Sequence, residues 1–183
     1  MRLRIAVLAS IAVAALTAGP ARAPIGASPD RLWTTNGDAA RRHAHVAAWR
    51  EPPDYVSANA GEEGFAELCA LLAERGVGIE VGVWSLENAG ILIATGIQPM
   101  RVLVETNDLD VAGAIGARLE EGGVSAPQLH HGGHTDAWRA LDKAIERGRD
   151  IRIGLEDTTF LPDGSTARDN AELVAEAARR VGA

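Results

Sequence analysis

The residues best placed to do chemistry lie in one short run, Arg152-Ile-Gly-Leu-Glu-Asp157. The run is typical of a strand, which we expect over residues 150–157. Side chains alternate across a strand, so Arg152, Gly154 and Glu156 should share one face, where two opposite charges require a polar cavity. Glu156 and Asp157 should lie at the C-terminal end of the strand, which is the catalytic end in parallel α/β folds. The alternative interpretation is an ordinary ion pair on a barrel strand.

Six short runs predict the strands that would position these residues. They span residues 24–28, 55–60, 78–84, 101–106, 127–132 and 150–157. Helical segments with recognisable ends lie between them, over residues 62–75, 85–95, 108–121 and 135–147. Ser85 and Thr135 are suitable N-caps, and a glycine follows each helical segment. A strand and a helix roughly every 23 residues predict either a (β/α) barrel or a doubly wound sheet.

Polar residues near the strand ends favour the barrel. They are Ser57, Asn59, Trp84, Glu105, His130, His131, Glu156 and Asp157. A ring of functional groups contributed by many strands is typical of a barrel. A dinucleotide-binding sheet would carry a glycine-rich turn after its first strand, where this chain has Ser28-Pro-Asp30. We therefore predict an α/β fold of the TIM (β/α)8 type.

The composition excludes several other classes of protein. A chain of 183 residues is one domain by length, and its Ala, Val, Leu and Ile suit helices packed on buried parallel strands. The net charge of −7 and the lack of basic runs argue against a nucleic-acid partner. Cys69 is the only cysteine, so neither an intrachain disulfide nor a cysteine zinc cage can form. Its apolar helical position predicts a buried structural thiol.

The first 23 residues allow two interpretations. An apolar run over residues 5–18 is followed by Ala21-Arg-Ala23, which is the pattern of a secretory signal with its cleavage site. The alternative is an Ala-rich helix that precedes the first predicted strand. The apolar run is too short to span a bilayer, so we expect no membrane partner.

Several motifs occur in a characteristic order over residues 24–183. They are Tyr55-Val-Ser-Ala-Asn59, Glu63-Gly-Phe65, Gly76 to Trp84, Arg101-Val-Leu-Val-Glu105, His131-Gly132 before Trp138, and Arg152 to Asp157. In these motifs the chain resembles the β-keto acid cleavage enzymes, whose founding activity is the cleavage of 3-keto-5-aminohexanoate. The resemblance implies a homo-oligomeric TIM barrel that binds a divalent metal, usually Zn²⁺. It also implies acyl exchange between a β-keto acid and acetyl-CoA, giving acetoacetate and a new CoA thioester.

The resemblance also implies a role for each residue of the opening run. Glu156 matches the carboxylate metal ligand of the family, and a carboxylate suits Zn²⁺. Arg152 would bind the carboxylate of the keto acid as a fork-shaped donor, and Asp157 would be the base that forms the carbon nucleophile. The metal would polarise the keto oxygen. The residues that match the substrate pocket are Ser28, Ser57, Asn59, Glu80 and His131.

Two features depart from the family pattern. The family has an H-x-H pair of metal ligands at the end of the second barrel strand, and this strand is missing here. His43-Ala-His45 is not a replacement, because it lies in a helical segment over residues 38–49, where positions two apart point about 200° from each other. The histidines near residues 130–134 favour a phosphate or substrate contact, or a solvated loop, over a rebuilt zinc site. The second departure is Ser28-Pro-Asp30, where the family has Ser-Thr-Gly.

The strand count matches an incomplete barrel. A TIM barrel typically needs about 250 residues and eight strands, and this chain has about six βα units. We interpret it as a partial TIM barrel over residues 24–183, preceded by the Ala-rich helix, and we expect a cytoplasmic location. Unpaired sheet edges would promote association. Three hypotheses remain: an acyl-exchanging enzyme with an incomplete metal site, a non-catalytic remnant, and a secreted small binding protein cleaved after Ala23.

Overall fold

The computed structural model describes residues 5–9, 12–15, 26–27 and 38–182 of the chain. Its strands form one sheet in the order β2-β1-β8-β7-β6-β5-β4-β3. They are β1 Ile5–Ala9, β2 Ala12–Ala15, β3 Gly26–Ala27, β4 Tyr55–Asn59, β5 Gly78–Val83, β6 Arg101–Glu105, β7 Gln128–His131 and β8 Asp150–Arg152. Neighbouring strands from β3 to β8 are parallel. The predicted strands after residue 50 are confirmed, with slightly shorter bounds for all but the last, which is much shorter than predicted.

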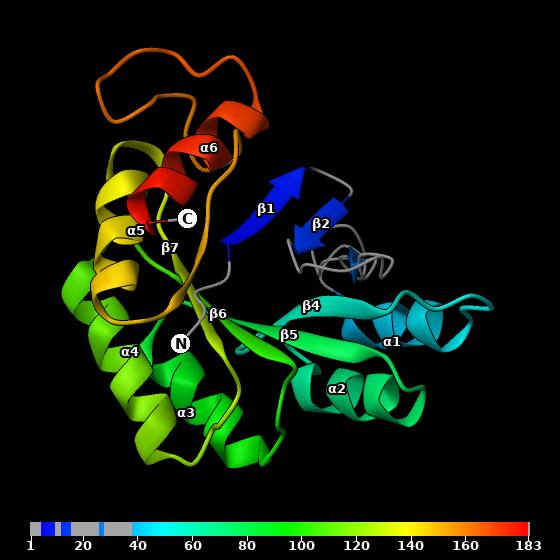
Figure 1. Ribbon diagram of the computed structural model, residues 1–183. Coiled ribbons are helices and arrows are strands. Elements are labelled where there is room, and N and C mark those ends of the chain that lie inside the picture. Colours follow the sequence, from blue (N-terminus) through cyan, green and yellow to red (C-terminus); the bar gives the residue numbers. More distant parts are fainter. Residues whose placement is uncertain (1–4, 10–11, 16–25, 28–37, 183) are drawn as a thin grey trace.

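From β3 onward, helices alternate with the strands along the chain (Figure 1). They are α1 Ala39–Ala47, α2 Phe65–Glu74, α3 Leu86–Thr95, α4 Leu109–Glu121, α5 Ala137–Glu146 and α6 Asn170–Arg180. Ser85 caps α3 as predicted, because its side chain accepts a hydrogen bond from the backbone N–H of Asn88. The prediction of Thr135 as an N-cap was wrong, since a short 3₁₀ turn over His134–Asp136 precedes α5. Helix α6 was not predicted.

The main core lies between the helices and one face of the sheet. Alternate residues of the strands, such as Val56, Val81 and Val104, are completely buried there, against helix residues such as Leu72 and Leu92. The apolar runs fold this way because a parallel strand presents every second side chain to the covering helices. The opposite face of the same strands carries the polar residues, and it is where the site lies.

The strand order distinguishes between the two predicted architectures. From β3 to β8 the strands are neighbours in chain order. A doubly wound sheet reverses its strand order at a switch point, and none occurs among these strands. The chain is therefore an α/β protein with consecutive βα units, which is compatible with a partial TIM barrel. The described pairs do not join β2 to β3, so closure of a barrel stays a prediction.

The helix predicted for the first 23 residues is contradicted wherever the structure describes that segment. Ile5–Ala9 and Ala12–Ala15 are antiparallel strands, and β1 pairs in parallel with β8 through Ile5 and Ile151. An edge strand offers a row of unpaired N–H and C=O groups, and the short apolar run at the chain start pairs with them. The predicted cleavage motif Ala21-Arg-Ala23 lies outside the described residues.

The last predicted strand is also shorter than residues 150–157. Strand β8 ends at Arg152, and a turn follows in which the carbonyl of Gly154 accepts hydrogen bonds from the N–H groups of Asp157 and Thr158. Strand alternation therefore does not place Glu156 beside Arg152. The turn does so instead.

No helix in the described part of the chain is both long and apolar enough to cross a membrane. The expected homo-oligomer and the cellular compartment stay predictions.

Candidate active site at the carboxyl ends of the strands

Polar side chains from four neighbouring strands meet where those strands end. Glu105 ends β6 and His131 ends β7, and the two residues are register partners. Glu105 Oε1 lies 3.7 Å from His131 Nε2, and Asp157 Oδ1 lies 3.3 Å from His131 Nδ1. Trp84, which follows β5, donates its indole N–H to Glu105 Oε2 at 2.9 Å. Arg152 ends β8 and completes the cluster.

Arg152 is the cation that the cluster shares. Its Nη2 lies 3.1 Å from Asp157 Oδ1 and is also paired with Glu156. Its Nη1 lies 3.4 Å from His131 Nε2. The side chain of Arg152 is 10% exposed and that of Asp157 is 4% exposed, whereas that of Glu156 is 46% exposed. The structure therefore brings together Arg152, Asp157 and His131, as the sequence predicted, and it places Glu156 at the solvent side of the arginine.

His131 is held between two carboxylates. Burial by itself would lower the pKa of its imidazole, but the side chains of Asp157 and Glu105 outweigh burial and raise the pKa above its usual value. The guanidinium of Arg152 opposes this rise. Because both ring nitrogens face carboxylate oxygens, the protonated form of His131 is the one that this arrangement favours.

Glu105 responds in the opposite direction. Burial would raise its pKa, but hydrogen bonding and charge from His131, together with the indole of Trp84, lower the pKa below its usual value. Glu105 therefore stays ionised beside the imidazole. The sequence showed Glu105 and Trp84 only as polar residues at strand ends, and it gave no sign that they contact each other.

The turn that carries Asp157 is tied to the loop after β7. The backbone N–H of His134 donates to the carbonyl of Asp157 at 2.5 Å, and His134 has a φ of 57°, in the left-handed region. A non-glycine residue in this region is uncommon, and such residues gather at functional sites. The strained loop thus fixes the position of the carboxylate-bearing turn.

Three atoms of the cluster are buried and have no hydrogen-bond partner within the described chain. They are Asp157 Oδ2, Arg152 Nε and His131 Nδ1, although His131 Nδ1 lies within ion-pair distance of Asp157 Oδ1. Buried polar atoms normally find a partner, and an exception calls for an explanation such as a ligand.

Two predicted pocket residues, Ser57 and Glu80, belong to a separate network on the same sheet face, nearer the amino ends of the strands. A third, Asn59, lies beside it. Ser57 donates to Glu80 Oε1 at 2.5 Å, and Arg101 donates its Nε to Glu80 Oε2 at 2.6 Å. Glu80 lies four residues before Trp84, which is about 13 Å along a strand. Asn59 donates instead to Glu62 Oε1 at 2.7 Å. Among the described residues, no hydrogen bond or ion pair joins these three to the Arg152 cluster. Ser28 lies outside the described residues.

The residues that could hold a metal are dispersed. His43 and His45 lie on α1, which confirms the predicted helix. His130 is buried on the other face of β7, where burial lowers its pKa to about 4 and its Nε2 lies 3.0 Å from Gln128 Oε1. Cys69 is buried, with its pKa raised by burial to about 12, which confirms a structural thiol.

These donors do not fit a zinc site. Every histidine and the single cysteine of the chain lie among the described residues, where no three His, Cys, Asp or Glu side chains form a cluster that could hold a metal. Glu156, the predicted ligand, is paired with Arg152. Its role as a metal ligand stays a prediction.

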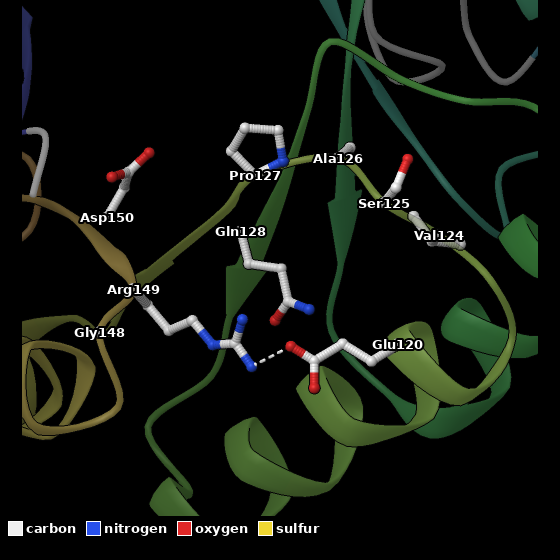
Figure 2. Close-up of a pocket in the computed structure, with 9 residues that line it drawn as sticks. All are labelled: Glu120, Val124, Ser125, Ala126, Pro127, Gln128, Gly148, Arg149 and Asp150. Carbon is white, nitrogen blue, oxygen red and sulfur yellow. Dashed lines mark hydrogen bonds and ion pairs between the residues drawn. The ribbon is translucent and has the colours of Figure 1, made fainter. Parts of the chain in front are cut away.

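A cavity of about 260 Å³ lies at the opposite ends of the strands (Figure 2). Its lining includes the start of β7 at Gln128 and the residues that lead into β8, and Arg149 pairs there with Glu120 at 2.5 Å. In βα folds this end serves stability rather than catalysis. The cavity is therefore separate from the Arg152 cluster.

Comparison with known proteins agrees with the geometry. A search of curated proteins finds no match to the chain. The model of the beta-keto acid cleavage enzyme family matches residues 9–183, which is almost the whole chain. The chain therefore belongs to the β-keto acid cleavage enzyme family.

Proposed function

We propose that this chain binds a β-keto acid and forms its enolate, which is the first half of the acyl exchange with acetyl-CoA. The observation that carries the proposal is the buried pair of Arg152 and Asp157, in which Arg152 Nε and Asp157 Oδ2 have no partner among the described residues. The arginine supplies fixed positive charge, and the aspartate supplies a carboxylate oxygen for a proton.

Arg152 would bind the carboxylate of the keto acid. Its present partner Glu156 is exposed, so a substrate carboxylate can take its place beside the guanidinium. A guanidinium suits this task because its planar fork matches two carboxylate oxygens.

Asp157 would act as the general base. The C–H bond at C2, between the keto and carboxyl carbons, breaks, the proton moves to Asp157 Oδ2, and the electron pair becomes the enolate. In the complete reaction the enolate carbon would attack the thioester carbonyl of acetyl-CoA and displace the CoA thiolate. The thiolate would then attack the original keto carbon and break its bond to C2, giving the new CoA thioester and, after C2 regains a proton, acetoacetate. Since the described side chains do not fit a zinc site, no step is assigned to a metal.

Exchange of the C2 hydrogens of acetoacetate with D₂O tests this function. We expect the protein to accelerate the exchange above the spontaneous rate, and Asp157→Asn to remove the acceleration, because the amide cannot accept the proton. Proton NMR follows the loss of the C2 signal. Equal rates for the wild-type protein, Asp157→Asn and buffer alone would reject the proposal.

Zinc binding should be weak. A catalytic zinc site uses about three protein ligands, and Glu156 alone is one. We expect less than stoichiometric zinc after dialysis, and slow label transfer from acetyl-CoA into acetoacetate, measured by metal analysis and radioactivity. Stoichiometric zinc that survives dialysis and is unchanged in Glu156→Gln would contradict both the assignment of Glu156 and the view that the metal site is incomplete.

The second candidate is a protein that binds a keto acid without chemistry. It is favoured by the lack of a three-ligand cluster among the described residues. Saturable binding of acetoacetate without C2 exchange would select this candidate.

A further inference from the structure

A continuous line of contacts leads from the surface to Asp157. It runs from the indole of Trp84 to Glu105 Oε2, from Glu105 Oε1 to His131 Nε2, and from His131 Nδ1 to Asp157 Oδ1. Each member comes from a different strand or turn, so the line exists only in the correct register of β5, β6 and β7. The proposed chemistry uses only its last member, Asp157.

The two oxygens of Asp157 are in different situations. Oδ1 faces both His131 Nδ1 and Arg152 Nη2, at 3.3 and 3.1 Å. Oδ2 has no hydrogen-bond partner among the described residues. Arg152 and protonated His131 both attract Oδ1, which restricts the rotation of the carboxylate, and Oδ2 is left for a ligand.

His131 can hold Oδ1 only if its own ring is fixed. The charged groups that face the ring are Glu105 from β6, Asp157 from the turn after β8, and Arg152 from β8. A neutral imidazole donates from one nitrogen only, whereas an imidazolium donates from both. Glu105 therefore orients the ring and favours its charged form. A carboxylate that faces the second ring nitrogen of a metal-binding histidine orients that ring in the same way.

We propose that Glu105 and His131 are positioning residues for Asp157: they hold Oδ1 and thereby assign Oδ2 as the oxygen that meets the substrate. Trp84 restrains Glu105 in turn, because its indole N–H holds the second carboxylate oxygen. This inference rests on the proposed function. It adds two residues for which the sequence resemblance gave no such role.

Glu105→Gln is the most informative variant. Glutamine keeps the shape and can still accept from Trp84, but it carries no charge for His131. We expect the C2 exchange of acetoacetate to slow roughly 10- to 100-fold, the range for loss of an orienting partner, with the KM for acetoacetate little changed. NMR titration of the histidines should show the pKa of His131, assigned with His131→Gln, to be raised in the wild-type protein and lowered in the variant.

Glu120→Gln is the matched control, since it removes the same charge from an ion pair at the opposite ends of the strands. It should leave both the exchange rate and the titration of His131 unchanged.

Normal exchange in Glu105→Gln, or an unshifted pKa of His131 in the wild-type protein, would overturn the positioning role while leaving the proposed function intact. Absence of exchange in the wild-type protein would instead reject the proposed function, and with it the catalytic part of this inference. A raised KM with an unchanged rate in Glu105→Gln would mean that Glu105 acts on binding alone, and would also overturn the positioning role.

Discussion

Arg152→Ala should reduce the C2 exchange of acetoacetate roughly 100- to 1,000-fold and weaken its binding, since a buried charged donor is lost from the site. In the alanine variant Asp157 stays buried without the guanidinium of Arg152. The variant therefore loses both the group that binds the substrate carboxylate and the charge that neutralises Asp157. Arg152→Lys should recover little, because a single ammonium does not replace a planar fork that contacts Asp157 and a second carboxylate. Exchange followed by NMR and binding followed by calorimetry measure the two effects.

Arg149 offers a matched control for this experiment. It precedes β8, pairs with Glu120 and lies at the opposite ends of the strands. Arg149→Ala and Arg149→Lys should therefore leave exchange and binding unchanged. Circular dichroism on every variant separates loss of function from loss of fold. Near-normal kinetics in both Arg152 variants would return this residue to an ordinary ion pair on a strand.

Arg101→Met should lower the free energy of unfolding by about 3–5 kcal/mol, which is the usual cost of removing one partner from a buried ion pair. Glu80 is 5% exposed, and its two oxygens are bonded to Arg101 and Ser57. Without the guanidinium, its charge would remain buried and uncompensated. Chemical denaturation of the wild-type protein and of the variant measures the difference.

The double variant Arg101→Met with Glu80→Leu tests the reason for that loss. Replacing both partners by apolar side chains removes the uncompensated charge, so most of the stability should return. A third variant, Glu80→Gln, examines Glu80 as a substrate residue. A Glu80→Gln variant with wild-type stability but weaker acetoacetate binding would show that Glu80 serves the substrate pocket rather than the fold.

The local pattern of the sequence was sufficient for the order of elements and for most of their bounds. Apart from the end of the last strand, the strands after residue 50 and the four helical segments between them were placed within a few residues. An apolar run, a capping residue such as Ser85 and a terminating glycine act over a few neighbouring positions. The family resemblance identified Arg152 and Asp157 as partners, and the structure shows their contact.

Only the tertiary structure decided which distant residues meet. The contact of Glu105 with His131 depends on the register of β6 and β7, and the pairing of Glu80 with Arg101 on that of β5 and β6. Likewise, the free edge of β8 determined that the chain start becomes a strand there rather than a helix. Pairing partners lie more than twenty residues apart, and no local pattern contains their register. The sequence by itself therefore determined which side chains stand at the strand ends, and strand pairing decided which charges neutralise one another.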